Sequence, residues 1–198
     1  KEQMSGFIRR IHEQCQKKST RQLINDDTTL VCAEILTQSR QNQLKEKLGF
    51  QKGDVVYLQF INYLEEMDRS IGAVLSAMDG TGYPDEAIRK MKIVLTELLV
   101  NAVIHGNKRD YSKRVVIGHV IRREQVVVSI MDEGEGFDPS KVPDPTLPEN
   151  LERPCGRGIY IVRHYVESVS YNDIGNRVTV IKINDLIADG PLNPFPLP

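Results

Sequence analysis

The sequence predicts a domain of the α/β class, because runs typical of helices and runs typical of strands alternate over most of its length. Helices are expected over residues 63–78, 84–105 and 159–166, and strands over residues 55–60, 115–121, 126–131, 168–172 and 177–183. Short polar turns at 122–125 and 173–175 join neighbouring strands and therefore predict two hairpins.

The ends of the longest helix carry clear local signals. Pro84 has a fixed φ that suits the start of a helix, and Asp85 and Glu86 in the first turn favour the positive end of the helix dipole. Gly106 follows at a position where glycine commonly ends a helix. The turn-forming residues 79–82 end the preceding helix, so the two helices are predicted to be separate elements.

The composition excludes several broad classes of protein. Among 198 residues, 26 basic side chains are matched by 27 acidic ones, and the formal charge of −1 provides no basic surface for nucleic acid. The most apolar stretch, residues 93–104, is interrupted by Thr96, Glu97 and Asn101 and is too short to span a membrane. Three cysteines without paired spacing, and no signal-peptide pattern, predict a cytoplasmic protein with reduced thiols.

Composition also divides the chain into parts. Residues 37–53 are poor in apolar side chains and predict a polar linker with some helix, residues 54–186 hold the α/β domain, and residues 187–198 form a proline-rich tail. Within the domain, residues 139–155 carry five prolines and predict a long functional loop. The chain starts without a methionine, so we expect residues 1–36 to be the end of a neighbouring domain in a longer protein.

One predicted helix carries a narrow polar stripe. Lys90, Glu97, Asn101, His105 and Lys108 fall within an arc of roughly 80° when residues are placed about 100° apart. The other positions of its central part are almost all apolar, which is typical of a buried helix. A carboxylate and a carboxamide need a partner when they are buried, so the stripe predicts either a ligand or metal site or a face open to solvent.

Two glycine motifs follow this helix. After strand 126–131 comes Asp132-Glu133-Gly134-Glu135-Gly136-Phe137-Asp138, in which alternate glycines let a ligand approach the backbone and Asp132 can accept a hydrogen bond from a ligand amino group. This spacing fits neither an EF-hand loop nor a Rossmann or P-loop motif. Gly156-Arg157-Gly158 precedes helix 159–166, where free backbone amides and Arg157 are suited to bind phosphate.

The three motifs together resemble the ATP-binding boxes of a known family. Glu97-x-x-x-Asn101-x-x-x-His105-Gly106, the Asp132–Asp138 motif and Gly156-Arg157-Gly158-Ile159 resemble the N, G1 and G2 boxes of the GHKL (Bergerat-fold) ATPases. In detail they resemble those of the anti-sigma-factor serine kinases, over about residues 54–186. The resemblance implies a two-layer α/β sandwich, with a mixed, mostly antiparallel sheet and helices on one face.

The resemblance implies a role for each motif residue. Asn101 would ligate magnesium, Glu97 would act as the base toward a substrate serine, and Asp132 would bind the adenine amino group of ATP. A lid formed by residues 139–155 would close over the phosphates. The nucleotide-binding residues implied in this way are Asn101, His105, Asp132, Gly134, Gly136, Gly156, Arg157 and Gly158.

The resemblance also implies partners. Members of this family transfer the γ-phosphate of ATP to a serine of a small anti-anti-sigma (STAS) protein, and often sequester a sigma factor as a dimer. A STAS protein, a sigma factor and a second copy of the chain are therefore the expected partners. Two other functions stay open: a histidine-kinase-type ATPase domain with a phosphoacceptor at His12, and an ATP-gated module that binds a partner without turnover.

A second resemblance concerns the start of the chain. Asn25-Asp26-Asp27-Thr28-Thr29-Leu30-Val31 resembles the last metal-binding turn and strand of a PP2C-type (SpoIIE-like) serine phosphatase, in which Asp26 or Asp27 would bind manganese or magnesium. An ordinary polar turn before a strand is the alternative. The other phosphatase motifs are missing from this sequence, so we expect no phosphatase activity from it.

Overall fold

The computed structural model describes residues 37–143, 145 and 157–187. Several sequence predictions lie outside these residues: the phosphatase-like segment with Asp26 and Asp27, the alternative phosphoacceptor His12, the glycine at 156, most of the proline-rich lid and nearly all of the tail. The division of the chain into a linker, a domain and a remnant of a neighbour stays a prediction.

The described strands form one five-stranded sheet in the order β1-β2-β3-β5-β4. Its strands are β1 (Tyr57–Ile61), β2 (Val115–Ile121), β3 (Gln125–Met131), β4 (Ser168–Tyr171) and β5 (Arg177–Ile183). All pairs between these described strands are antiparallel, so the sheet contains none of the parallel pairing that a mixed sheet would have. Both predicted hairpins, β2–β3 and β4–β5, are confirmed.

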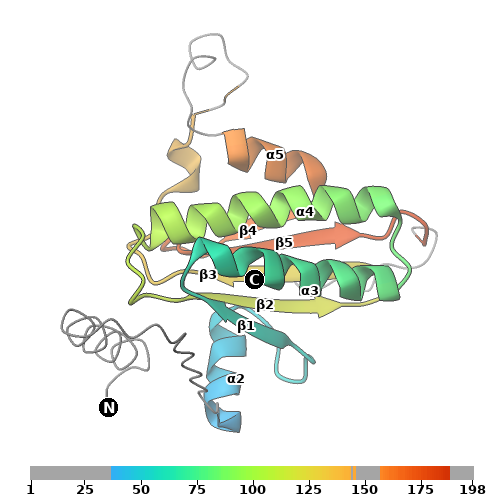
Figure 1. Cartoon of the computed structure of the whole chain (residues 1–198), viewed down its shortest axis with the longest axis horizontal. Coiled ribbons are helices and arrows are strands. Elements are labelled where there is room, and N and C mark those ends of the chain that lie inside the picture. The colour runs from blue at the N-terminus through green and yellow to red at the C-terminus, as the bar shows by residue number, and fades with distance from the viewer. Residues whose placement is uncertain (1–36, 144, 146–156, 188–198) are drawn as a thin grey trace, which may run out of the picture.

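Three helices cover one face of this sheet, as predicted. They are α3 (Met67–Gly80), α4 (Asp85–Val100) and α5 (Arg157–Tyr165), and Figure 1 shows α3 and α4 running across the sheet with α5 beyond α4. Alternate strand residues point toward the helices and are almost fully buried, among them Val115, Ile117, Val126, Val128, Ile130 and Val180. This alternation is the period of two that places every second strand side chain in one core.

A fourth helix, α2 (Gln38–Lys47), lies on the opposite face, where Figure 1 shows it projecting from the far side of the sheet. It falls within the predicted polar linker, and its few apolar residues pack on the sheet: Leu44, Leu48 and, just beyond, Phe50 are buried in a second core. Gly118 on β2 leaves room for them, because a Cβ there would lie 2.7 Å from a Leu48 methyl carbon. The expectation of helices on one face therefore holds for α3, α4 and α5 but not for α2.

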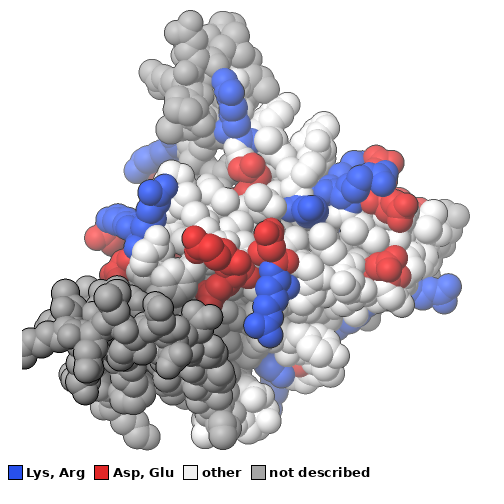
Figure 2. All heavy atoms as spheres, in the orientation of Figure 1, with Lys and Arg blue, Asp and Glu red and all other residues white. Residues whose placement is uncertain are grey.

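Three shorter helical turns complete the fold: η1 (Leu64–Glu66), η2 (Asn101–Gly106) and η3 (Pro139–Lys141). None of the described helices is long and apolar enough to cross a bilayer. Acidic and basic side chains are interspersed on the face in Figure 2, consistent with the near-zero formal charge and without a surface of one sign.

Candidate functional site

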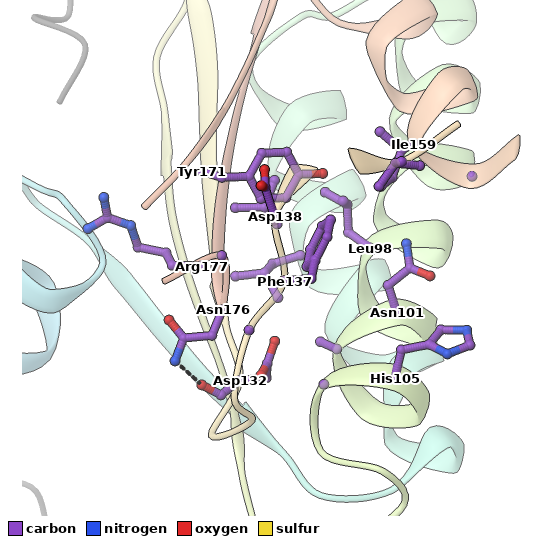
Figure 3. Close-up of a pocket in the computed structure, with 18 of the residues that line it drawn as sticks. Leu98, Asn101, His105, Asp132, Phe137, Asp138, Ile159, Tyr171, Asn176 and Arg177 are labelled. Atoms are coloured by element: carbon purple, nitrogen blue, oxygen red, sulfur yellow. Dashed lines mark hydrogen bonds between the residues drawn. The ribbon is translucent and has the colours of Figure 1, made fainter. Parts of the chain in front are cut away.

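A cavity of about 780 Å³ opens between the α4–η2 helix and the ends of β3 and β5. Its volume lies within the range of about 300–1,000 Å³ that is usual for small-molecule sites. Figure 3 shows its two walls: Leu98, Asn101 and His105 from the helix, and Asp132, Asn176 and Tyr171 from the strand side. The polar stripe and the first glycine motif therefore face one another across a single cavity.

The helix wall carries four of the five residues of the predicted stripe. Glu97, Asn101, His105 and Lys108 all line the cavity, so the stripe faces a space large enough for a ligand. The fifth, Lys90, lies two turns earlier and forms an ion pair of 2.7 Å with Glu86.

The predicted long helix changes its hydrogen-bonding pattern within the site. The α-helix ends at Val100, and a π-helical turn, η2, follows over Asn101–Gly106, a feature that is frequent at functional sites. The chain then leaves the helix through Lys108 and Arg109, which adopt left-handed φ angles of 54° and 56°. Such angles are uncommon for residues other than glycine, so the surrounding contacts must hold this turn in place.

Asp132 is the central acidic group of the strand wall. One carboxylate oxygen, Oδ1, accepts a hydrogen bond of 2.8 Å from the backbone N–H of Gly134, and the other side of the group adjoins Gly106. Burial raises the pKa of Asp132 above its ordinary value, because the charged form loses solvation there. The partly buried carboxylate can accept a hydrogen bond from a ligand amino group, the chemistry expected of it from the sequence.

The glycines of the first motif are required for backbone packing, whereas their spacing suggested the approach of a ligand. A Cβ on Gly134 would collide with the backbone carbonyl of Gly106, and one on Gly136 would collide with the carbonyl of Ile174. Gly136 also has a φ of +77°, in the region that favours glycine. These glycines therefore let three backbone segments pack closely around the cavity; Gly136 lines it and Gly134 does not.

The start of α5 lies directly against the helix wall. A Cβ on Gly158 would sit 2.5 Å from Glu97 Oε2 and 3.7 Å from Asn101 Nδ2, so a larger residue there would displace the Glu97 carboxylate. Gly158 lines the cavity, as predicted. Arg157 is the first residue of α5 but is not among the described residues of the cavity wall, and the structure does not describe the preceding glycine, residue 156.

Sequence reasoning missed two asparagines that support the site. Asn107 is 3% exposed, and its Oδ1 accepts a hydrogen bond of 2.9 Å from the backbone of Glu133, which ties the end of η2 to the first glycine motif. Asn176 exchanges hydrogen bonds with the Asp132 peptide, at 3.0 Å and 3.3 Å. Their positions gave a usable signal, because Asn107 directly follows Gly106 and Asn176 flanks a predicted turn.

The site offers oxygen donors suited to magnesium. The carboxamide of Asn101 and the carboxylate of Glu97 lie together beside Gly158. In the part of the chain that the structure describes, no three His, Cys, Asp or Glu side chains gather as a metal cluster. Magnesium commonly binds through one or two protein side chains together with substrate phosphates, so the Asn101 carboxamide fits it and the Glu97 carboxylate beside it stays available to a substrate hydroxyl.

An antiparallel sheet covered by α3, α4 and α5, with an N-box helix facing an aspartate at a strand end, defines an ATP-binding domain of the GHKL class. The family model of the histidine kinase-like ATPase domain matches residues 62–182, more than half of the chain. The chain therefore belongs to this family.

Similar proteins come from one group within that class. The chain is 31% identical over 121 residues to the anti-sigma F factor of Anoxybacillus flavithermus, covering 59% of this chain and 80% of that protein. It is 28% identical over 115 residues to the anti-sigma F factor of Clostridium perfringens (57% and 79%). It is also 29% identical over 98 residues to the serine-protein kinase RsbW of Oceanobacillus iheyensis, covering 46% of this chain but only 62% of the length of that kinase.

Proposed function

We propose that this chain is an ATP-dependent protein-serine kinase of the anti-sigma-factor type. It transfers the γ-phosphate of ATP to a serine of an anti-anti-sigma (STAS) partner. The observation that carries the proposal is the placement of Glu97, Asn101 and Asp132 on facing walls of one cavity. The similarity to a protein named serine-protein kinase and to two named anti-sigma F factors supports the same assignment.

In this proposal the two walls divide the nucleotide between them. Asp132, ionised, accepts a hydrogen bond from the adenine amino group, and Gly136 lies against the base and ribose. His105, which also lines the cavity, contacts the nucleotide from the helix wall. The phosphates lie at the start of α5, where Arg157 and Gly158 offer backbone amides and a positive charge.

Phosphoryl transfer then requires positioning and charge neutralisation more than covalent chemistry. The substrate serine oxygen attacks the γ-phosphorus, the bond from that phosphorus to the bridging oxygen breaks, and ADP leaves. Glu97 accepts the proton of the attacking hydroxyl. Asn101 provides a protein oxygen for magnesium, which when bound neutralises charge on the β- and γ-phosphates.

The wider biology is part of the proposal. We infer a sigma factor as a second partner, a homodimer as the assembly and a cytoplasmic location. A module that binds ATP and a partner without turnover, and a histidine-kinase-type ATPase, are the alternatives that the following experiment separates.

The test is transfer of labelled phosphate from ATP to a panel of STAS proteins, with Glu97→Gln as the variant. Loss of a general base should reduce the transfer rate by at least about 100-fold while ATP still binds. Glu86→Gln is the matched control on the same helix, because Glu86 forms a surface ion pair with Lys90 and does not line the cavity, so this variant should retain full activity. Equal rates in wild type and Glu97→Gln would refute the role of Glu97. ATP binding without any serine phosphate would favour the binding module, and acid-labile phosphate would favour the histidine kinase.

A further inference from the structure

The helix α2 lies outside the stretch that matches the family, residues 62–182, yet it is attached to the wall of the nucleotide cavity. The attachment runs through Arg177, the first residue of β5. Its Nη1 donates a hydrogen bond of 2.9 Å to the backbone carbonyl of Lys47, at the C-terminal end of α2. An arginine there satisfies a carbonyl that has no partner inside the helix, and its charge suits the negative end of the helix dipole.

The fit between Arg177 and α2 is close. Gly49, just after the helix, has a φ of +85°, and a Cβ at that position would lie 3.2 Å from Arg177 Nη1. Figure 3 shows the Arg177 side chain directed away from the cavity, although the residue itself belongs to the cavity wall. Arg177 therefore joins two faces of the sheet.

On the cavity side, Arg177 is connected to Asp132 by a short series of hydrogen bonds. Its backbone N–H donates to Asn172 Oδ1 at 3.0 Å, and Asn172 Nδ2 donates to Asn176 Oδ1 at 2.9 Å. Asn176 in turn exchanges hydrogen bonds with the Asp132 peptide. In the sheet, Arg177 pairs with Met131, the residue before Asp132. Arg177 is therefore connected, through two asparagines and one strand pair, to the peptide that carries the Asp132 carboxylate.

A second cavity, of about 250 Å³, lies on the α2 side of this connection. It is lined by residues of α2 and of the first glycine motif, and it shares Asp132 and Asn176 with the nucleotide cavity. Asp132 and Asn176 therefore border open space on the α2 side as well as on the nucleotide side. On the side of β5 they are held by the hydrogen bonds that run through Asn172 to Arg177.

We propose that Arg177 is a positioning residue of the nucleotide site, which holds Asp132 in place through Asn176 and is itself held by docked α2. This inference rests on the proposed ATP-binding function and deepens it, because it makes α2 docking a regulator of nucleotide affinity. By thermodynamic linkage, nucleotide binding must then strengthen the docking of α2 by the same factor.

The test compares, in the full chain, two substitutions that each remove one contact between the sheet and residues in or just after α2. Arg177→Met removes the hydrogen bond to Lys47 and retains the apolar stem. Arg122→Met removes the ion pair of 3.1 Å between Arg122 and Asp54, a residue of the stretch that follows α2. Arg122 lies just before β3 and Asp132 just after it, so the length of the strand places them roughly 20 Å apart. Thermal unfolding of both variants measures the general loss of stability.

Calorimetry with magnesium-ATP provides the decisive comparison. Arg177→Met should bind about 5- to 10-fold more weakly, a normal size for coupling between sites, while the transfer rate at saturating ATP changes less than about twofold. Arg177→Lys should recover part of the affinity, and Arg122→Met should bind like wild type. Hydrogen exchange should show that ATP protects the last turn of α2 in wild type but not in Arg177→Met.

Each outcome separates the inference from the proposed function. Wild-type affinity in Arg177→Met, or an equal loss in Arg122→Met, overturns the positioning role while leaving the kinase proposal intact. Failure of the wild-type chain to bind ATP overturns the proposed function and, with it, the inference. ATP binding without phosphate transfer, combined with the expected affinity pattern, sustains the inference and overturns only the kinase step.

Discussion

The contact between Gly106 and Asp132 makes a quantitative prediction for Gly106→Ala. An added Cβ would lie 2.5 Å and 2.6 Å from the two carboxylate oxygens of Asp132, whereas ordinary contact distances begin at 3.4 Å. The backbone of Gly106 is not in the left-handed region, so alanine adds no backbone strain of that kind to this collision. We expect the carboxylate to retreat by about 1 Å, which would break the proposed hydrogen bond to the adenine amino group.

A hydrogen bond to a charged group contributes about 1.5–3 kcal/mol, so Gly106→Ala should weaken ATP binding by roughly 10- to 150-fold. Calorimetric titration with magnesium-ATP measures this loss. Gly72→Ala in the middle of α3 is the matched control, because a Cβ there meets nothing within 4 Å. That control should leave affinity unchanged and stabilise the fold by about 0.5–1 kcal/mol. A folded Gly106→Ala protein that binds ATP within threefold of wild type would refute the role of this contact.

Two further predictions concern the second core and the charge of the site. Leu48 is 1% exposed, so Leu48→Ala should destabilise the protein by about 2–5 kcal/mol in a denaturant titration; a loss below 1 kcal/mol would mean that α2 docks without contributing to the fold. Burial raises the pKa of Asp132 above 3.8, and only its ionised form accepts hydrogen bonds without also donating one. ATP affinity should therefore be complete above that raised pKa and fall as the pH drops through it. Hydrogen bonds from Ser140 lower the pKa of neighbouring Asp138, so Asp138 stays ionised through this step. Calorimetry across this pH range should show weaker but pH-independent binding in Asp132→Asn; a step that persists in that variant would contradict the assignment.

Much of the fold was predictable because its signals are local. The nearly continuous apolar runs of β2 and β3 and the polar turn between them specify the hairpin, and Pro84 with Gly106 marks the limits of the long helix closely. The conversion of its last turn to a π-helix was not predictable, because the bond from the Asn107 N–H to the carbonyl of Ala102, five residues earlier, has no signature in the local sequence. The docking of α2 was missed for a similar reason, since three apolar residues in a polar stretch give little periodicity.

The sequence by itself determined the chemistry available to this protein: a carboxylate, a carboxamide and an imidazole on one helix, and an aspartate at the end of a strand between glycines. These groups follow from the spacing of residues along single helices and strands, because the regular hydrogen bonding of each element fixes the side to which each side chain points. Only the tertiary structure decided that these groups face one another across one cavity and that the glycines serve backbone packing. Only the tertiary structure also joined Arg177 to α2, because contacts between residues 130 positions apart depend on the packing of the whole sheet.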